Sequence, residues 1–220
     1  MIKFKLLKVI VFIFITITFI LMVNNWNDET MSNTKKIPSI IEKEAKIALS
    51  HYPELENVPI DFVIKKSLKK SFMKAQPRFS SFFKTRNNRA YIIYMSDTFK
   101  LDGLSLRLND IPKEVLIGWL GHELGHVMDY RSRSAFGMII FGIRYITSSG
   151  FTREAERSAD TYAVSNGMVD YILKTKSFIL DNANLSEKYK NHIKRNYLSP
   201  DQILLIAKEQ DSLQLLKANQ

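Results

Sequence analysis

Residues 118–130 read Gly-Trp-Leu-Gly-His-Glu-Leu-Gly-His-Val-Met-Asp-Tyr, and the expected architecture follows from them. His122, Glu123 and His126 stand there in the order His-Glu-x-x-His. Because positions i and i+4 of a helix lie on one face, one turn apart, the two imidazoles can bind a single Zn²⁺ ion. The Glu123 carboxylate then lies near the metal, where it can take a proton from a water molecule and pass it to a leaving amine. The segment predicts a catalytic zinc site on a helix.

The sequence around these residues favours a helix that other elements approach closely. Pro112 suits the first helical turn, and apolar residues recur after it at three- and four-residue spacing. Glycine costs a helix about 1 kcal/mol relative to alanine, yet this helix contains Gly118, Gly121 and Gly125. We therefore expect a second helix or a strand packed against this backbone. An accidental match on a surface helix is the alternative, but the chain has only 4 histidines.

A catalytic zinc site also needs a third protein ligand and one open position for water. A third histidine six residues after the second is excluded, because that position is Ser132. Residues 152–164, Thr-Arg-Glu-Ala-Glu-Arg-Ser-Ala-Asp-Thr-Tyr-Ala-Val, predict a separate helix on which Glu156 and Asp160 share a face. We predict Glu156 as the third ligand and Asp160 as the carboxylate that orients a ligating histidine through a hydrogen bond. The alternative for both is a charged helix face exposed to solvent.

Two motifs together, Gly-His-Glu-Leu-Gly-His and the downstream Glu156-Arg-Ser-Ala-Asp160, resemble those of the HtpX and CAAX-prenyl-protease group of gluzincin metallopeptidases. The resemblance covers about residues 110–167. It implies a zincin-like fold, a minimal gluzincin with a small antiparallel or mixed sheet, an active-site helix and a helical C-terminal part. It also implies a zinc endopeptidase in which His122, His126 and Glu156 bind the metal and the glutamate after the first histidine is the general base. The larger members have several membrane spans, whereas this chain has one candidate at most, so their substrates are not carried over.

Length and composition suit one globular domain behind an N-terminal segment. The chain has 220 residues, of which 45% are hydrophobic and 25% charged. It has no cysteine, which excludes cysteine zinc ligands, disulfides and thiol catalysis. We predict an N-terminal membrane anchor or signal peptide at residues 1–23, a polar linker at 24–37 and the metallopeptidase domain at 38–220.

Residues 1–23 favour an uncleaved membrane anchor. Lys3, Lys5 and Lys8 precede residues 9–23, which carry no charge. Extended back to Leu6, with the Lys8 side chain reaching to the membrane surface, a helix over residues 6–23 is just long enough to span a bilayer. A cleaved signal peptide is the alternative, but the following sequence offers no Ala-x-Ala-like cleavage site. The lysines before the run and the acidic residues after it place the N-terminus in the cytoplasm. We therefore expect a single-pass protein of the cytoplasmic membrane that contacts lipid through residues 6–23 and has its catalytic domain on the extracytoplasmic side.

The segment before the zinc motif predicts a helix and a small sheet, which gives an α+β fold class. Residues 38–51 read as a helix, and residues 58–66 alternate apolar and polar side chains as a strand does. Residues 79–97 predict a hairpin with its turn at Asn87-Asn88. By resemblance and chain order, we expect the strand at 89–96 to border the cleft and to pair with extended substrate.

Residues 65–89 are rich in Lys and Arg, contain no acidic residue and are interleaved with phenylalanines. A solvated hairpin with its phenylalanines in the core explains this composition. Contact with anionic lipid headgroups is a second explanation and an acidic substrate or polymer a third. Single-stranded nucleic acid is the least favoured partner, because the expected anchor removes the domain from the cytoplasm.

The remaining sequence predicts further helices. Residues 135–147 are apolar but too short to cross a bilayer, so we expect a buried helix or an amphipathic segment at the membrane surface. Residues 167–220 predict two or three helices, one of them starting near Pro200. His192 and Tyr197 are candidates for stabilising the oxyanion of a tetrahedral intermediate, although a solvated surface position is commoner for such a histidine.

These features predict a membrane-anchored, zinc-dependent endopeptidase with one Zn²⁺ ion per chain, which acts on protein or peptide substrates. Glu123 is its expected general base. The alternative is a non-catalytic, membrane-tethered module whose zinc site is structural and which contacts lipid or a protein partner. A structural site is closed by a fourth protein ligand, and His51 and His192 are the only histidines left over.

Overall fold

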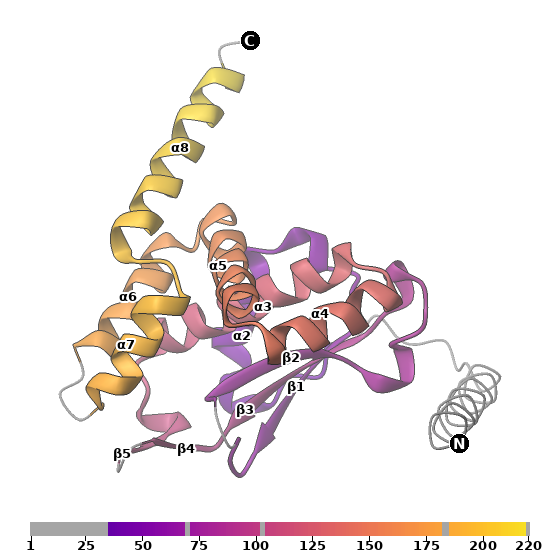
Figure 1. Cartoon of the computed structure of the whole chain (residues 1–220), viewed down its shortest axis with the longest axis horizontal. Coiled ribbons are helices and arrows are strands. Elements are labelled where there is room, and N and C mark those ends of the chain that lie inside the picture. The colour runs from indigo at the N-terminus through magenta and orange to yellow at the C-terminus, as the bar shows by residue number, and fades with distance from the viewer. Residues whose placement is uncertain (1–34, 69–70, 102–103, 182–184, 219–220) are drawn as a thin grey trace, which may run out of the picture. The chain divides into compact units, whose positions relative to one another are not determined.

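A three-stranded sheet, a two-stranded hairpin and a set of helices make up the described part of the chain, which gives an α+β fold with mostly helical content (Figure 1). The computed structural model describes residues 35–68, 71–101, 104–181 and 185–218. The strands are β1 (Ile60–Lys65), β2 (Met73–Pro77), β3 (Tyr91–Ser96), β4 (Thr98–Leu101) and β5 (Leu104–Arg107). The helices are α2 (Glu42–Ser50), α3 (Lys113–Ser132), α4 (Ala135–Thr147), α5 (Ser149–Ser165), α6 (Val169–Leu180), α7 (Glu187–Asn196) and α8 (Pro200–Ala218).

The central strand of the sheet is β3. On one side β1 pairs with it in parallel, with Ile60 opposite Tyr91. On the other side β2 pairs with it antiparallel, with Ala75 opposite Ile93. The strands β4 and β5 form a separate antiparallel hairpin. β2 is therefore an edge strand of the mixed sheet, and it packs beside α3.

The predicted hairpin over residues 79–97 is wrong. The antiparallel partner of β3 is β2, which ends at Pro77, and the connection to β3 contains short 3₁₀ turns at Phe79–Ser81 and Arg86–Asn88. Because β3 is hydrogen-bonded on both sides, the strand that was expected to pair with substrate has no free edge. The helix and the strand predicted before this region are confirmed as α2 and β1.

The helix α3 lies at the centre of the fold. It packs against α2, α5, α6 and β2, and most of its side chains are buried. Its glycines allow this approach, because a Cβ atom on Gly125 would overlap the Ala159 carbonyl of α5. A Cβ atom on Gly118 would likewise overlap the Tyr171 carbonyl of α6. The close packing predicted for this helix is confirmed, and it brings side chains of α3 and α5 together.

The helix α5, which carries both predicted carboxylates, begins and ends at local signals. At its start, the Ser148 side chain accepts a hydrogen bond from the Phe151 N–H. Just beyond its end, Gly167 adopts a φ of 77°, a left-handed conformation that glycine accommodates without strain. The helix predicted over residues 152–164 is confirmed and begins earlier, at Ser149.

The helices α4 and α8 keep large apolar side chains exposed. On α4, Met138 and Phe141 are buried, whereas Phe136 and Ile146 are 71% and 85% exposed. Residues 135–147 therefore form a helix with one buried side. On α8 the exposed large apolar side chains are Leu204, Leu205, Leu213, Leu215 and Leu216.

The membrane predictions require correction. Among the described residues, no helix is both long enough and apolar enough to cross a bilayer. The longest helices, α3 and α8, carry charged side chains, and the apolar helix α4 is too short. We therefore correct the predictions of a transmembrane helix, a single-pass cytoplasmic-membrane protein and an extracytoplasmic catalytic domain. Residues 1–23, on which the anchor was placed, lie outside the described residues.

Candidate metal centre

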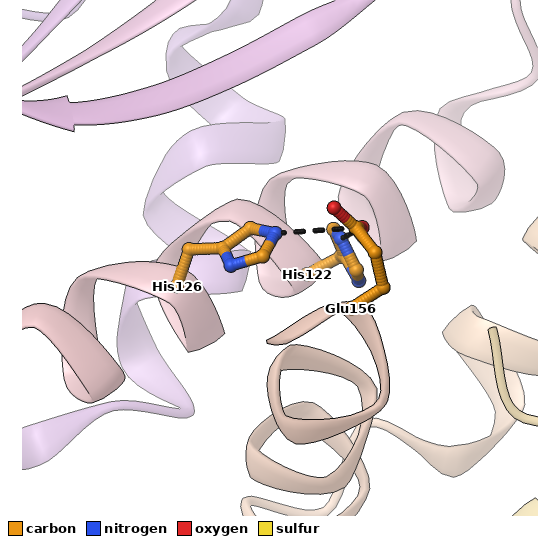
Figure 2. Close-up of side chains that lie close together, drawn as sticks. All are labelled: His122, His126 and Glu156. Carbon is orange, nitrogen blue, oxygen red and sulfur yellow. Dashed lines mark hydrogen bonds and ion pairs between the residues drawn. The ribbon is translucent and has the colours of Figure 1, made fainter. Parts of the chain in front are cut away.

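Two histidines of α3 and one glutamate of α5 come together in the buried interior (Figure 2). His122 and His126 lie one turn apart, and their rings meet edge to face with centroids 4.8 Å apart. The Oε2 atom of Glu156 lies 3.1 Å from His122 Nε2 and 3.5 Å from His126 Nε2. The three candidate ligand atoms all lie within 4.8 Å of one another. The structure thus brings together the three residues that the two motifs single out.

This donor set fits a zinc ion. Two imidazole nitrogens and one carboxylate oxygen are ligands that zinc takes in catalytic sites. Around a tetrahedral ion with bonds of about 2 Å, ligand atoms lie about 3.3 Å apart, which matches both carboxylate–imidazole distances. All three residues are at most 7% exposed. Among the described residues, this is the only such cluster, and no fourth side chain of His, Cys, Asp or Glu joins it.

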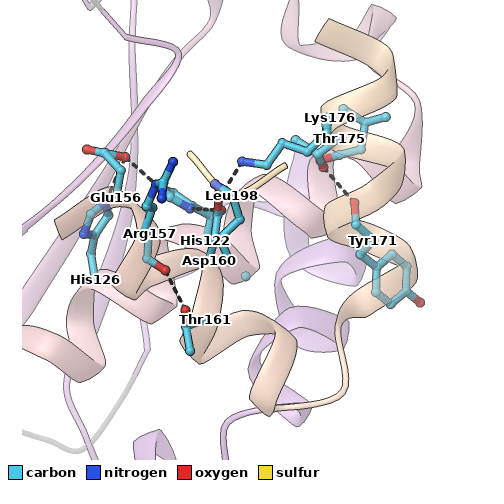
Figure 3. Close-up of polar contacts among 12 residues, drawn as sticks. His122, His126, Glu156, Arg157, Asp160, Thr161, Tyr171, Thr175, Lys176 and Leu198 are labelled. Carbon is cyan, nitrogen blue, oxygen red and sulfur yellow. Dashed lines mark hydrogen bonds and ion pairs between the residues drawn. The ribbon is translucent and has the colours of Figure 1, made fainter. Parts of the chain in front are cut away.

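A buried carboxylate orients His122 (Figure 3). The Nδ1 atom of His122 lies 2.8 Å from Oδ1 of Asp160, which is fully buried on α5. The other oxygen of Asp160, Oδ2, accepts hydrogen bonds from the Lys176 ammonium at 2.8 Å and from the Leu198 backbone N–H at 3.0 Å. The structure therefore places Asp160 at hydrogen-bond distance from a candidate ligand, as the spacing of α5 predicts, and turns Nε2 of His122 towards Glu156.

The buried charges decide the protonation of this site without a metal. Burial acts to lower the pKa of His122, but its hydrogen bonds to Asp160 and Glu156 outweigh that effect and raise the pKa to about 10. Burial acts to raise the pKa of Glu156, but the two histidines hold it well below its usual range. The pKa of Asp160 is also held below its ordinary value against burial, first by Lys176 and then by His122. A proton therefore occupies His122 near neutral pH, and a bound metal ion must displace it.

The fold holds His126 in a different way. Its Nδ1 atom is buried and has no hydrogen-bond partner within the described part of the chain. Its ring instead stacks on that of Tyr130, with centroids 5.8 Å apart and an interplanar angle of 16°. Packing against an aromatic ring, rather than a hydrogen bond to Nδ1, thus fixes the orientation of this imidazole.

Glu123 lies next to the ligand set and contacts the sheet. Its Oε2 atom accepts a hydrogen bond of 2.6 Å from the Ala75 N–H on the edge strand β2. Burial raises the pKa of the Glu123 carboxyl, although the neighbouring histidines oppose this. A raised carboxyl pKa suits a group that accepts a proton and then returns it near neutral pH.

Two tyrosines approach the site on the side of Glu156. The Tyr145 hydroxyl of α4 donates a hydrogen bond to Glu156 Oε1, which leaves Oε2 to face the histidines. Burial and the Glu156 charge raise the pKa of Tyr145, so its hydroxyl stays protonated as a donor. The Tyr197 ring lies 5.5 Å from that of His122, and burial and Glu156 raise its pKa well above the ordinary value.

The two predicted oxyanion candidates therefore lie in different places. The structure brings Tyr197 to the ligand set. It leaves His192 exposed on α7, where its Nδ1 atom lies 3.0 Å from the side-chain nitrogen of Asn196. His192 stacks on Tyr189 and has no contact with a ligand atom among the interactions of the described residues.

Sequence reasoning misses the roles of Tyr130, Tyr145, Lys176, the Leu198 N–H and the Ala75 N–H. A signal for the Ala75 N–H existed, because Met73-Lys-Ala-Gln-Pro77 alternates apolar and polar residues as a strand does. Nothing in the sequence near Tyr145 or Lys176 signals a role, because each reaches the site only through the packing of its helix on α5.

No protein-family model, no curated protein and no solved structure matches this chain.

Proposed function

We propose that this protein is a zinc-dependent endopeptidase. The observation that carries the proposal is the convergence of His122, His126 and Glu156, whose ligand atoms lie within 4.8 Å of one another. A bound zinc ion supplies a Lewis acid that polarises a carbonyl group and lowers the pKa of a water molecule towards 7. These three side chains would hold the ion, and a three-residue set leaves a coordination position open for water or substrate.

In this proposal Glu123 moves the proton. The Ala75 N–H fixes Oε2 of Glu123, and the carboxylate takes a proton from the attacking water. As the water oxygen bonds to the scissile carbonyl carbon, Glu123 delivers that proton to the amide nitrogen, and the carbon–nitrogen bond breaks. The products are a carboxylic acid and an amine, so one water molecule is consumed and Glu123 is regenerated.

The edge strand β2 is the element that an extended substrate can meet. The Ala75 N–H points to Glu123, so this side of β2 faces the proposed active site rather than β3. An extended peptide can add to such an edge through main-chain hydrogen bonds, although the Ala75 N–H itself is taken by Glu123. Pro77 has no N–H, so it limits the ladder that the peptide can form at that end of the strand.

The resemblance to the HtpX and CAAX-prenyl-protease group remains a prediction, as does the zincin-like fold. Both would account for the two motifs and for the pairing of Asp160 with a ligating histidine. They add no substrate to the proposal.

A non-catalytic zinc site is the second candidate. A structural zinc site takes four protein ligands, whereas the described residues supply three. Neither remaining histidine closes the site: His51 contacts the Asn166 carbonyl, and His192 lies exposed on α7. A three-ligand set with a carboxylate beside it supports the catalytic candidate.

The test is hydrolysis of a casein-type protein by the full-length chain. We expect activity with zinc, loss of activity with a chelator and recovery when zinc is restored. The Glu123→Gln variant should bind zinc like the wild type but lose at least about 10²-fold in rate, because proton transfer is removed. Glu114→Gln is the matched control, since Glu114 lies on the same helix with an exposed side chain.

Two outcomes would change the assignment. Hydrolysis that persists in Glu123→Gln contradicts the role of Glu123 as the base. A wild-type chain that binds zinc tightly but hydrolyses nothing favours the non-catalytic site instead.

A further inference from the structure

A buried lysine lies behind the metal ligands and takes no part in the proposed proton transfer. Lys176 of α6 is only 5% exposed, although lysine is rarely buried without a partner. Its ammonium lies 2.8 Å from Asp160 Oδ2 and 4.2 Å from the centre of the Tyr197 ring. Figure 3 shows this side chain reaching from α6 towards Asp160. Because both charges are withdrawn from water, removing either one would leave the other buried without this partner.

The two carboxylate oxygens of Asp160 have different hydrogen-bond partners. Oδ2 accepts hydrogen bonds from Lys176 and from the Leu198 N–H, whereas Oδ1 faces Nδ1 of His122. Two donors on one oxygen fix the rotation of the carboxylate, so the other oxygen is held towards the imidazole. The hydrogen bond from Nδ1 in turn aims the opposite ring nitrogen, Nε2, at the metal position.

The charge of Lys176 adds to this geometric effect. Asp160 and Glu156 lie one helical turn apart on α5, and both are buried. Two buried carboxylates at that spacing repel each other, and the lysine offsets the charge of the one that does not ligate.

We propose that Lys176 is a positioning residue for the metal ligand His122 and that it acts through Asp160. The inference rests on the proposed zinc function, because the ligand that Lys176 aims matters only when a metal binds. Removal of the lysine would free the carboxylate to rotate, and His122 would no longer be held in the orientation that zinc needs.

A purely structural ion pair is the competing explanation. Such a pair would hold α6 on α5 and change the stability of the fold, whereas a positioning residue also changes metal binding in protein that is fully folded. The two explanations differ further in coupling, because a residue that acts through Asp160 has nothing to act on once that carboxylate is gone.

The experiment compares Lys176→Met, Asp160→Asn and the double variant in the full-length chain. Zinc affinity is measured by competition with a chromophoric chelator, and ligand geometry by the d–d absorption of the Co²⁺ form. We expect Lys176→Met to weaken zinc binding about 10-fold or more and to shift the Co²⁺ bands. In the Asp160→Asn background, the same substitution should change the affinity by less than about 2-fold.

Lys174→Met is the matched control. Lys174 lies two residues earlier on the same helix, but its side chain is 55% exposed and lies 3.7 Å from the exposed Glu114. We expect its zinc affinity and Co²⁺ spectrum to equal those of the wild type. If Lys176→Met does not fold by circular dichroism, Lys176→Leu takes its place, because leucine lacks both the charge and the donor for Asp160.

The inference would be overturned if the folded Lys176 variant has the zinc affinity and Co²⁺ spectrum of the wild type. It would also be overturned if the losses simply add in the double variant. A wild-type chain that binds no zinc removes the proposed function and the inference with it. A wild-type chain that binds zinc and hydrolyses protein, with an unchanged Lys176 variant, removes the inference alone.

Discussion

His122 and His126 lie one turn apart on the same helix, yet the fold supports them in different ways. The Nδ1 atom of His122 is hydrogen-bonded to Asp160. Asp160 in turn accepts hydrogen bonds from Lys176 of α6 and from the Leu198 N–H. The Nδ1 atom of His126 is buried without a hydrogen-bond partner in the described part of the chain, and its ring stacks on Tyr130. One imidazole is thus oriented by directed hydrogen bonds and the other by packing.

Because of this difference, substitutions should affect the orientation of the two histidines in different ways. A hydrogen-bonded ligand depends on each member of its network, because a buried partner left unpaired costs free energy. A stacked ligand depends on the presence of a ring but little on the polar atoms of that ring. Substitutions behind His122 should therefore disturb metal binding more than comparable substitutions behind His126.

The largest effect should come from the ligand that both histidines face. Glu156→Ala removes the oxygen that lies 3.1 Å from one imidazole and 3.5 Å from the other. We expect zinc content, measured by elemental analysis, to fall from one ion per chain to none. Glu154→Ala, at an exposed position of the same helix, should retain the metal. Full zinc content in Glu156→Ala would mean that another group binds the ion.

The next effect should come from the carboxylate behind His122. Asp160→Asn keeps the volume of the side chain but puts an amide against Lys176, and it removes the charge that orients the imidazole. We expect zinc affinity to fall about 10- to 100-fold, measured by chelator competition. An unchanged affinity would show that packing alone suffices for His122, and the difference between the two histidines would disappear.

Zinc binding should also depend on pH through His122, whose pKa in the metal-free protein is raised to about 10. Since zinc needs the neutral imidazole, binding must release that proton, so affinity should rise about tenfold per pH unit from neutrality towards pH 10. In the metal-free protein the sign is opposite: the raised pKa stabilises the fold below pH 6.5, and this stability is lost as the pH rises through about 10. Calorimetry in buffers of different ionisation enthalpy counts the released protons, and a count of zero would contradict a protonated His122.

The smallest effect should come from the residue behind His126. Tyr130→Phe keeps the ring that stacks on the imidazole, so zinc affinity should stay within about 2-fold of the wild type. Tyr130→Ala removes the ring and should weaken binding more than Tyr130→Phe does. Equal and large losses in both variants would show that the hydroxyl, rather than the stacked ring, supports His126.

Local spacing explains which parts of the site can be predicted from the sequence. The histidines of α3 and the two carboxylates of α5 are each separated by four residues, and helix geometry alone puts such pairs on one face. The glycines of α3 likewise indicated that a neighbour approaches closely, and Gly125 does meet the Ala159 carbonyl.

Residues whose position depends on how helices and strands pack together, rather than on local spacing, were not predicted. Lys176 stands in the run Lys-Thr-Lys of α6, where Lys174 is exposed and Lys176 buried, and only the packing of α6 on α3 and α5 decides between them. The edge strand β2 was missed because lysine-rich sequence surrounds its short alternating pattern. The hairpin turn expected at Asn87-Asn88 was a local signal that the longer connection from β2 to β3 overrides.

Leu198, whose N–H donates a hydrogen bond to Asp160, comes late in the chain. Ala75, whose N–H donates a hydrogen bond to Glu123, comes early. During synthesis, α3 is therefore made before the last donor of this network, the Leu198 N–H. Ions captured at that stage would meet an imidazole that is still free to turn. The network that orients His122 is therefore complete only after Leu198 has been synthesised and has folded onto Asp160.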